Sequence, residues 1–296
     1  MESDNSGACS QCPHCCDVDR VTVLGLCKAN NQIKINTYLL HKGEEPVISG
    51  ENGSGTIFFS HCNLKCVYCQ NYKISDWGYG KYYTVDEVAE IMLSLQRNGA
   101  HNINLVSPTH YSLQIKEAII LAKEKGLDIP IVWNSNSYER VETLLQLEGL
   151  VDIYLADFKY WDDNNAIKYS AAPNYAEHAK KAILEMYRQV GNLKIDDDTG
   201  LAYSGLLIRL LVLPQNINGI QSVLNWISEE VGNMTYLSLM SQYYPTHRAD
   251  EFPEINRPIT CDEYDYAVHI MEGLGFENGF TQEMGITPEW TPNFKE

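Results

Sequence analysis

The chain of 296 residues is 44% hydrophobic and 21% charged, a composition typical of globular proteins and unlike that of disordered ones. At this length a chain buries roughly 75% of the surface that its unfolded form exposes, so its core needs no disulfide bonds. The net charge of −17 argues against a nucleic acid or an anionic membrane as partner, because both are bound by clustered Lys and Arg.

Charge and cysteines are unevenly distributed along the chain. Residues 250–296 contain eleven acidic and two basic side chains, which predicts an acidic C-terminal segment. The sequence shows neither a run of about 20 apolar residues nor the pattern of a signal peptide, which predicts a cytoplasmic protein. Eight of the nine cysteines precede residue 70. An odd number of cysteines in a reducing compartment favours metal or redox chemistry over a disulfide framework.

Strand and helix patterns alternate through the body of the chain. Capping boxes predict helix starts at Thr84 with Glu87, Asn174 with Glu177, and Thr260 with Glu263, and Gly99 and Gly126 predict helix ends. Short apolar or β-branched runs predict six strands, at residues 56–60, 102–107, 130–134, 151–157, 206–214 and 235–241.

This alternation implies parallel strands joined by helices, in either a doubly wound sheet or a complete or partial α/β barrel. No GxGxxG motif follows the first strand, which disfavours the dinucleotide-binding fold. Six units predict a partial (β/α)6 barrel over residues 46–296, preceded by a cysteine-rich, metal-binding extension over residues 1–45. In such barrels the chemistry lies at the carboxyl ends of the strands.

Three cysteines, Cys62, Cys66 and Cys69, directly follow the first predicted strand with the spacing C-x3-C-x2-C. Three thiolates can hold three irons of a 4Fe-4S cluster and leave the fourth iron open for a substrate or cofactor. A structural zinc site is the alternative, but it normally uses four ligands, often as two C-x2-C pairs.

The spacing, with an aromatic residue before the last cysteine, resembles the signature of the radical S-adenosylmethionine (radical SAM) superfamily. The resemblance implies a cluster that binds S-adenosylmethionine and cleaves it to methionine and a 5'-deoxyadenosyl radical, which takes hydrogen from a substrate. It also implies that Tyr68 lies near the adenine. The matching segments look like a subfamily similar to pyruvate formate-lyase activating enzyme: 104–110, 133–139, 157–160, 169–173, Arg209 and 239–243.

That subfamily usually grips the methionine amine with a Gly-Gly-Glu-Pro segment after the second strand. Here Ser107, Pro108, Thr109 and His110 stand in its place. Ser107 and Thr109 could accept the ammonium group, and His110 is either a further cofactor residue or a helix-start residue. A turn that ends the strand and caps the next helix would suit the same residue types.

Charged residues at the ends of two later strands are further cofactor-binding candidates. Asp157 and Lys159 are two apart at a strand end, so both side chains should face the barrel interior; the resemblance assigns them to the ribose and carboxylate of S-adenosylmethionine. Arg209 interrupts an apolar strand and needs an anion, either the methionine carboxylate or a barrel Asp or Glu. Asn134, Asn136 and Gln242 are weaker candidates that could instead cap a helix or turn.

A second group of cysteines lies near the N-terminus. The resembled subfamily has a C-x2-C-P-x-x-C head followed by a later cysteine, which implies Cys9, Cys12, Cys16 and Cys27 as ligands, with Cys15 spare. His14 replaces the usual arginine and could join a mixed ligand set. Four thiolates suit either zinc or an iron-sulfur cluster, and free thiols remain an alternative.

The sequence thus predicts a radical SAM enzyme that uses a one-electron donor such as flavodoxin or ferredoxin and has a protein or peptide among its candidate substrates. Activation of a glycyl radical enzyme is the alternative. Against it, His61 replaces the glycine usual before the first cluster cysteine, and only fourteen residues separate Cys69 from Thr84. A hypothesis of another class is a non-catalytic electron-transfer or metal-binding protein, which would not need Asp157, Lys159 or Arg209 at a barrel mouth.

Overall fold

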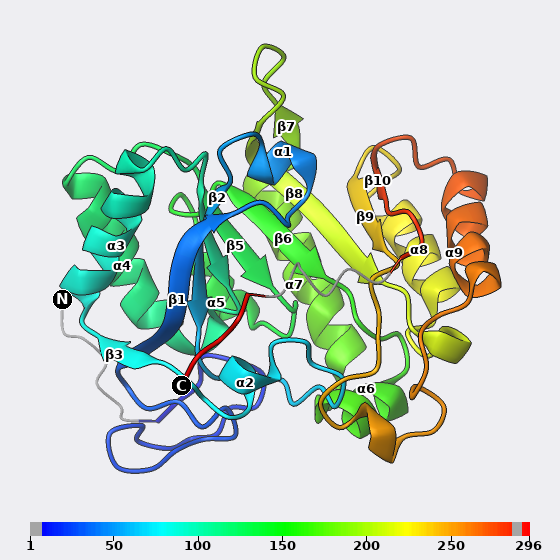
Figure 1. Ribbon diagram of the computed structural model, residues 1–296, viewed down its shortest axis with the longest axis horizontal. Helices are drawn as coiled ribbons and strands as arrows, with labels where there is room; N and C mark the ends of the chain where they lie inside the picture. The colour runs from blue at the N-terminus through cyan, green and yellow to red at the C-terminus, as the bar shows by residue number, and fades with distance from the viewer. Residues whose placement is uncertain (1–7, 286–291) are drawn as a thin grey trace.

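A computed structural model describes residues 8–285 and 292–296. Its centre is an open, mostly parallel sheet with the strand order β10-β9-β8-β6-β5-β4-β2-β1-β3, and β7 pairs with β8 outside this path (Figure 1). The six predicted strands are confirmed, and they form six of its seven described parallel strands: β2 (Ser54–Phe59), β4 (Ile103–Val106), β5 (Ile131–Ser135), β6 (Ile153–Asp157), β8 (Ala202–Leu211) and β9 (Tyr236–Met240).

Helices follow these strands and cover the sheet, which confirms the predicted α/β partial barrel. In Figure 1 they lie on both sides of the sheet and behind it. Their bounds are α1 Pro46–Ser49, α2 Tyr72–Ser75, α3 Val85–Arg97, α4 Ser112–Glu124, α5 Val141–Leu145, α6 Asp163–Ser170, α7 Tyr175–Val190, α8 Ile220–Glu230 and α9 Cys261–Gly273.

Strands of the sheet take part in three apolar clusters, of which the smallest consists of Phe58, Ile74 and Phe294. The largest one joins strands to the helices and includes Ile57, Met92 and Ile183. The second one forms around the short helix α1, whose Val47 and Ile48 pack with residues of β5, β6 and β8. Strands buried on both faces are expected to be apolar almost throughout, as β6 is in its four buried residues 153–156. Helix α1 therefore covers the part of the sheet face that the longer helices leave exposed, and we call this short helix the α1 plug.

Four strands were not predicted: β1 (Ile33–His41), β3 (Lys81–Tyr83), β7 (Lys194–Ile195) and β10 (Gly279–Thr281). β1 and β3 form an antiparallel edge, and their half-exposed residues lack the continuous apolar run of the central strands. β7 and β10 have only two and three residues, too few to show a period. Because β1 pairs with β2, the sheet begins inside the segment predicted as the extension.

Two of the three predicted capping boxes are confirmed, at Thr84 and Thr260. The third prediction was wrong. Asn174 adopts a left-handed conformation and its side chain makes no cap hydrogen bond. Instead, Asp163 accepts the Tyr175 N–H at 2.9 Å and caps α7 from another helix.

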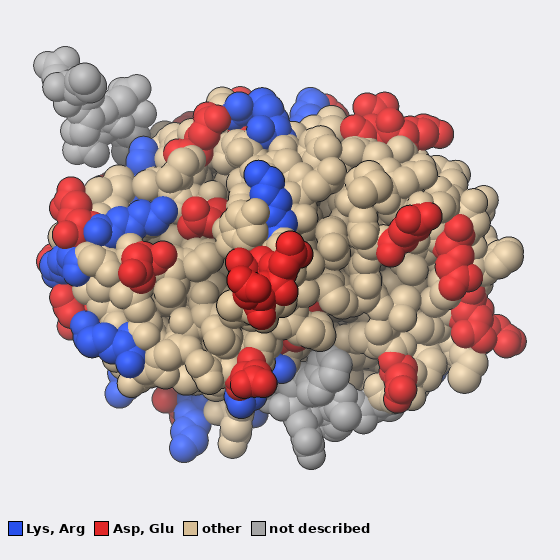
Figure 2. All heavy atoms as spheres, turned by 90° about the horizontal axis from the view of Figure 1, so that it is seen from above, with Lys and Arg blue, Asp and Glu red and all other residues tan. Residues whose placement is uncertain are grey.

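The surface charge follows the uneven sequence distribution. In Figure 2, Lys and Arg side chains gather over one half of the visible face, whereas the other half shows mainly Asp and Glu. In the part of the chain that the structure describes, no helix is long and apolar enough to cross a bilayer.

We predict that the α1 plug is essential for stability. Ile48 is completely buried, so Ile48→Ala should lower the free energy of unfolding by about 2–5 kcal/mol, as other large-to-small core substitutions do. Ile120→Ala on exposed α4 is the matched control and should change it by less than about 1 kcal/mol. Denaturant unfolding measures both, and equal effects would show that α1 does not plug the sheet.

Candidate functional site

The predicted site residues meet at one cavity of about 240 Å³ at the carboxyl ends of the parallel strands. This is where an α/β barrel places its chemistry, because the loops leaving the strands converge there. Its lining includes all three cysteines of the first loop and eight further predicted residues, Tyr68, Ser107, Asn134, Asn136, Asp157, Lys159, Arg209 and Gln242.

The cysteine loop leaves β2 through a sharp turn at His61. The φ of His61 is 72°, in the left-handed region that glycine adopts without strain, which explains why a glycine would suit this position. Two backbone hydrogen bonds then fix the loop: the Lys65 N–H donates to the Ser170 carbonyl at 2.9 Å and the Val67 N–H to the Tyr169 carbonyl at 2.8 Å. The loop is thereby fastened to the end of α6.

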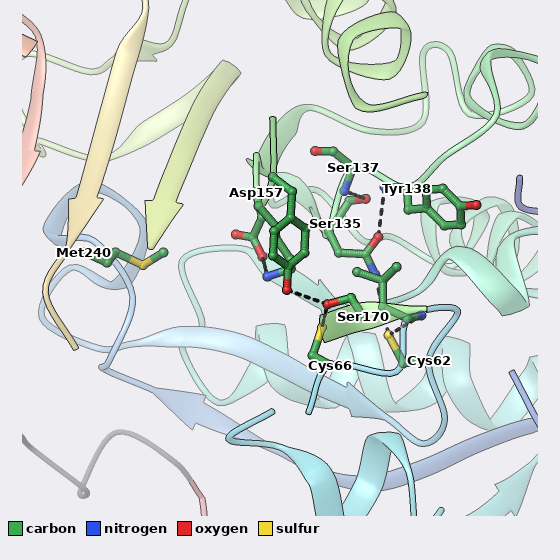
Figure 3. A network of polar contacts seen from close by, with 12 residues as sticks. Cys62, Cys66, Ser135, Ser137, Tyr138, Asp157, Ser170 and Met240 are labelled. Atoms are coloured by element: carbon green, nitrogen blue, oxygen red, sulfur yellow. Dashed lines mark hydrogen bonds and ion pairs between the residues drawn. The ribbon is translucent and has the colours of Figure 1, made fainter. Parts of the chain in front are cut away.

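Each sulfur of the loop has a polar neighbour, and Figure 3 shows the surroundings of Cys62 and Cys66. Ser170 Oγ donates to Cys66 Sγ at 3.0 Å, and Asn136 Nδ2 donates to Cys62 Sγ at 3.5 Å. Cys69 Sγ and Ser75 Oγ are 3.2 Å apart. Burial raises the pKa of Cys66 to about 12 and also raises that of Cys69. Buried thiols of this kind ionise only with a strong positive partner, which iron ions supply.

The residues fit a three-cysteine cluster site. The three sulfurs line one cavity, and the polar side chains nearest to them belong to Ser and Asn, which are not the usual ligands of such clusters. Among residues 8–285 and 292–296, no group of three or more His, Cys, Asp or Glu side chains is arranged to hold a metal ion. In a 4Fe-4S cluster the three thiolates would each bind a different iron.

Behind Cys66 a short hydrogen-bonded chain ends at Tyr68. The hydroxyls of Tyr68 and Tyr160 are 2.5 Å apart, and Tyr160 lies 2.7 Å from Ser170 Oγ. Burial raises the pKa of both tyrosines well above their usual range, so both hydroxyls stay neutral. Tyr68 reaches the cavity as predicted, and Tyr160 and Ser170 connect it to the cysteine.

Asp157 and Lys159 form an ion pair at the end of β6. Lys159 Nζ lies 2.7 Å from Asp157 Oδ2, and both side chains are mostly buried. Burial by itself would lower the pKa of Lys159, but Asp157 and then Cys66 raise it above its usual range. Lys159 is therefore a permanent cation beside the cysteine loop. The structure thus contains an ion pair between Asp157 and Lys159. A contact of either residue with a cofactor stays a prediction.

Arg209 already has two carboxylate partners in this structure. Its Nε donates to Glu45 Oε1 at 2.9 Å, and its Nη2 contacts both Glu44 and Glu45. Burial alone would raise the pKa of Glu45, but Arg209 holds it below its usual value. Arg209 thus pairs with acidic side chains of the protein, one of the two alternatives expected from the sequence. Its partners Glu44 and Glu45 lie in the loop before α1 and were not among the predicted residues. Arg209 still borders the cavity.

The segment predicted to replace Gly-Gly-Glu-Pro contributes only Ser107 to the cavity lining. Thr109 is buried and donates to Glu139 Oε1 at 2.7 Å, and His110 Nε2 donates to the Ser60 carbonyl at 2.8 Å. Burial lowers the pKa of His110 to about 3, so its ring is neutral. Thr109 and His110 are therefore engaged in hydrogen bonds within this turn and do not line the cavity in this structure, and a cofactor contact for either residue stays a prediction.

The amide candidates divide in a similar way. Asn136 donates to Asn63 Oδ1 at 2.8 Å as well as to Cys62, so it positions the cysteine loop. Asn134 borders the cavity at the end of β5. Gln242 lines it after β9, and its backbone carbonyl accepts a hydrogen bond from Gln70 at 3.0 Å.

The N-terminal cysteines gather beneath the cysteine loop. The pKa of Cys12 is raised mainly by burial and further by the nearby thiols of Cys27, Cys9 and Cys16, which shows that the four predicted ligands are neighbours. Cys15 is exposed, in keeping with its spare role. All nine cysteines lie in the described residues and none forms a disulfide.

Several residues of the site were not among the predicted site residues, because their contribution depends on contacts with residues far away in the sequence. Glu44 and Glu45 belong to a polar loop, and only the buried Arg209 signalled that some acid must lie near it. Tyr160 and Ser170 become part of the site only through the packing of α6 against the cysteine loop. Asn63, within the cysteine motif itself, could have been noticed as a polar residue between two ligands.

Comparison with known proteins agrees with this geometry. The model of the family described as Radical SAM superfamily matches residues 56–227, more than half of the chain. The uncharacterized protein MJ0674 of Methanocaldococcus jannaschii is 34% identical over 274 residues, which cover 89% of this chain and 74% of MJ0674.

Solved structures show the same fold at low sequence identity. Streptococcus suis SuiB bound to S-adenosylmethionine is 14% identical with a TM-score of 0.52, and the match covers 75% of this chain and 48% of SuiB. Methylornithine synthase PylB is 15% identical with a TM-score of 0.50 over 80% of this chain and 71% of PylB. The chain thus spans about half the length of SuiB.

We predict that removing Arg209 leaves the two mostly buried carboxylates of Glu44 and Glu45 without a positively charged partner. Arg209→Met should lower the free energy of unfolding by about 3–5 kcal/mol, whereas Arg248→Met, at an exposed ion pair with Glu251, should change it little. Because the folded pKa of Glu45 is depressed, the stabilisation is full above its ordinary value of 4.5 and is lost as pH falls below it. Denaturant unfolding as a function of pH measures this, and a pH-independent difference between wild type and Arg209→Met would contradict it.

Proposed function

Because the chain belongs to the radical SAM superfamily, we propose that Cys62, Cys66 and Cys69 hold a 4Fe-4S cluster at which S-adenosylmethionine is reductively cleaved to methionine and a 5'-deoxyadenosyl radical. The radical then takes hydrogen from a substrate. The observation that carries the proposal is the meeting of three thiols with Asp157, Lys159 and Tyr68 at one cavity. The structure of SuiB with bound S-adenosylmethionine supports it through the shared fold.

The residues of this chain have distinct roles in that reaction. Lys159 places a fixed positive charge beside Cys66, which favours the thiolate. Asp157 holds the Lys159 ammonium in place through the 2.7 Å contact. Tyr68 presents a buried, neutral ring to the cavity, a suitable surface for a purine. The buried side chains of Leu64 and Val67 shield the cysteine loop from water.

For the substrate, we propose a protein or peptide, with reduced flavodoxin or ferredoxin as electron donor. Activation of a glycyl radical enzyme is the alternative. Two features weigh against it: His61 stands in a left-handed turn suited to glycine, and only the short elements α2 and β3 separate Cys69 from α3. A purely electron-carrying protein is less well supported, because a carrier needs no mostly buried Asp157–Lys159 pair at a cavity.

The central test is cleavage by the anaerobically reconstituted protein. With dithionite as reductant it should form 5'-deoxyadenosine, detected by chromatography, and Cys66→Ala should abolish the product because one iron loses its ligand. Cys261→Ala removes an exposed cysteine at the start of α9 and serves as the matched control. Cleavage by a variant with alanine at Cys62, Cys66 and Cys69 would overturn the proposal.

A second prediction concerns the cofactor pocket. Asp157→Asn and Lys159→Met should weaken binding of S-adenosylmethionine about 10- to 150-fold, the effect of losing a charge-assisted hydrogen bond, while the iron content stays the same. Lys181→Met, at an exposed ion pair on α7, is the control for loss of a charge. Calorimetric titration decides this, and unchanged affinity in both pocket variants would leave the pair with a structural role only.

A further inference from the structure

We propose that Cys9, Cys12, Cys16 and Cys27 hold a second iron-sulfur cluster, which passes electrons to the catalytic cysteine loop through the contact between His14 and Asn63. This inference rests on the proposed function, because it assigns a route for the electron that the cleavage reaction consumes. Four observations carry it: the grouping of the four thiols, the N–H groups that face them, their spacing, and the bridge to Cys62.

Backbone N–H groups are directed at three of the four sulfurs. The N–H of Leu26 points to Cys16 Sγ and that of Ala29 to Cys27 Sγ, each at 3.5 Å. The His14 N–H makes the corresponding bond to Cys12. N–H groups around sulfur stabilise the thiolate and tune the reduction potential of a cluster. The backbone of the extension therefore places three N–H groups where they would stabilise metal-bound thiolates.

The arrangement of the thiols favours a cluster over zinc. A single zinc ion binds sulfur at 2.3 Å and so holds its thiolates roughly 3.8 Å apart. No three such side chains in the described part of the chain are arranged to hold a metal ion. The same is true of Cys62, Cys66 and Cys69, which the family uses for a 4Fe-4S cluster. A cluster does not require thiolates as close together as a single zinc ion does, because each thiolate binds a different iron.

His14 joins the two cysteine groups. Its backbone N–H faces Cys12, and its ring Nε2 donates to the Asn63 carbonyl at 2.8 Å, next to Cys62 in the chain. Asn63 Oδ1 in turn accepts a hydrogen bond from Asn136, whose amide also reaches Cys62 Sγ. A continuous chain of covalent and hydrogen bonds therefore runs from one set of sulfurs to the other.

The extension is held rigidly against the barrel, so this bridge keeps a fixed length. Buried Arg20 donates to the carbonyls of Ala29, Asn30 and His110. The Ser10 carbonyl accepts from Arg140, and the Gln11 carbonyl accepts from Thr143 at 2.9 Å. In Figure 1 the dark blue N-terminal segment lies directly below the sheet. Cys9 and Cys16 are only partly buried, so the N-terminal site is accessible from the surface.

The electron count is simple. Reductive cleavage breaks the bond between the sulfonium sulfur and C5' with one electron, giving methionine and the 5'-deoxyadenosyl radical. In the proposal a reduced flavodoxin or ferredoxin loses this electron, the N-terminal cluster is reduced and reoxidised, and the catalytic cluster receives it. No proton or further reactant is needed for this step.

The first experiment determines the metal. Anaerobically reconstituted wild type should contain about eight irons per chain and Cys9→Ser or Cys12→Ser about four. Cys15→Ser, the exposed neighbour in the same segment, is the matched control and should keep about eight. Electron paramagnetic resonance of the reduced wild type should show two clusters, of which only one responds to S-adenosylmethionine. About one zinc per chain in place of the second four irons would overturn the proposal.

The second experiment tests the relay with two reductants. Dithionite is small enough to reach the catalytic cluster through the open cavity, whereas a reduced flavodoxin must deliver its electron at the surface. In His14→Phe, which keeps all seven ligands, the ratio of flavodoxin-driven to dithionite-driven cleavage should fall roughly 10- to 100-fold, as for other residues that support a metal site. His14→Gln can still donate to Asn63 and should restore much of the ratio.

The outcomes separate this inference from the proposed function. If wild type forms no 5'-deoxyadenosine with dithionite, the proposed function fails. If both reductants drive cleavage and the ratio is the same in wild type, His14→Phe and Cys12→Ser, the relay is wrong while the proposed function stands. A fall in cleavage that is equal for both reductants would show that the extension is structural and would likewise overturn the relay.

Discussion

The cysteine loop depends on the two backbone hydrogen bonds that fasten it to the end of α6. A loop that must present three thiols cannot adopt regular structure, so its buried N–H groups need partners elsewhere. The carbonyls of Tyr169 and Ser170 supply them, because α6 ends there and these groups lack helical partners. The same Ser170 donates its hydroxyl to Cys66. One helix end therefore sets both the path of the loop and the surroundings of its central sulfur.

A second constraint is the way the open side of the sheet is filled. Helix α1 has only four residues, yet Val47 and Ile48 bury its apolar side against the inner strands. This packing pulls the preceding loop inward and places Glu44 and Glu45 against Arg209. A buried ion pair of this kind adds little net stability, but losing one partner is costly. We infer that the main effect of Arg209 and the two glutamates is to fix the position of this loop at the edge of the cavity, and that their net contribution to the stability of the fold is small.

Features that leave a local pattern in the sequence, such as an apolar run or a fixed spacing of cysteines, could be predicted. The six parallel strands follow from apolar runs, and Cys62, Cys66 and Cys69 follow from their spacing after β2. Residues whose role depends on distant contacts could not be predicted. Thr109 turned inward because Glu139, thirty residues later, offers a buried acceptor, and Asn174 lost its capping role because Asp163 takes it. The edge strand β1 was not predicted because most of its residues are only partly buried, so its sequence lacks the continuous apolar run of a central strand.

The charges around the cavity form two opposed groups, and their order constrains how a ligand can lie in it. Lys159 stands beside Cys66 and balances part of the negative charge that three thiolates bring. Glu44 and Glu45 face Arg209, so this group has one carboxylate more than its single guanidinium can neutralise. Charges in a poorly hydrated cavity interact more strongly than in water. S-adenosylmethionine carries a positive sulfonium, a positive ammonium and a negative carboxylate. Lys159 is already paired with Asp157, so in the proposed function the stronger preference is that of the two positive groups for the side of the glutamates. The sequence left Arg209 to bind either the methionine carboxylate or a barrel Asp or Glu; its pairing with both Glu44 and Glu45 makes that edge of the cavity favour cations.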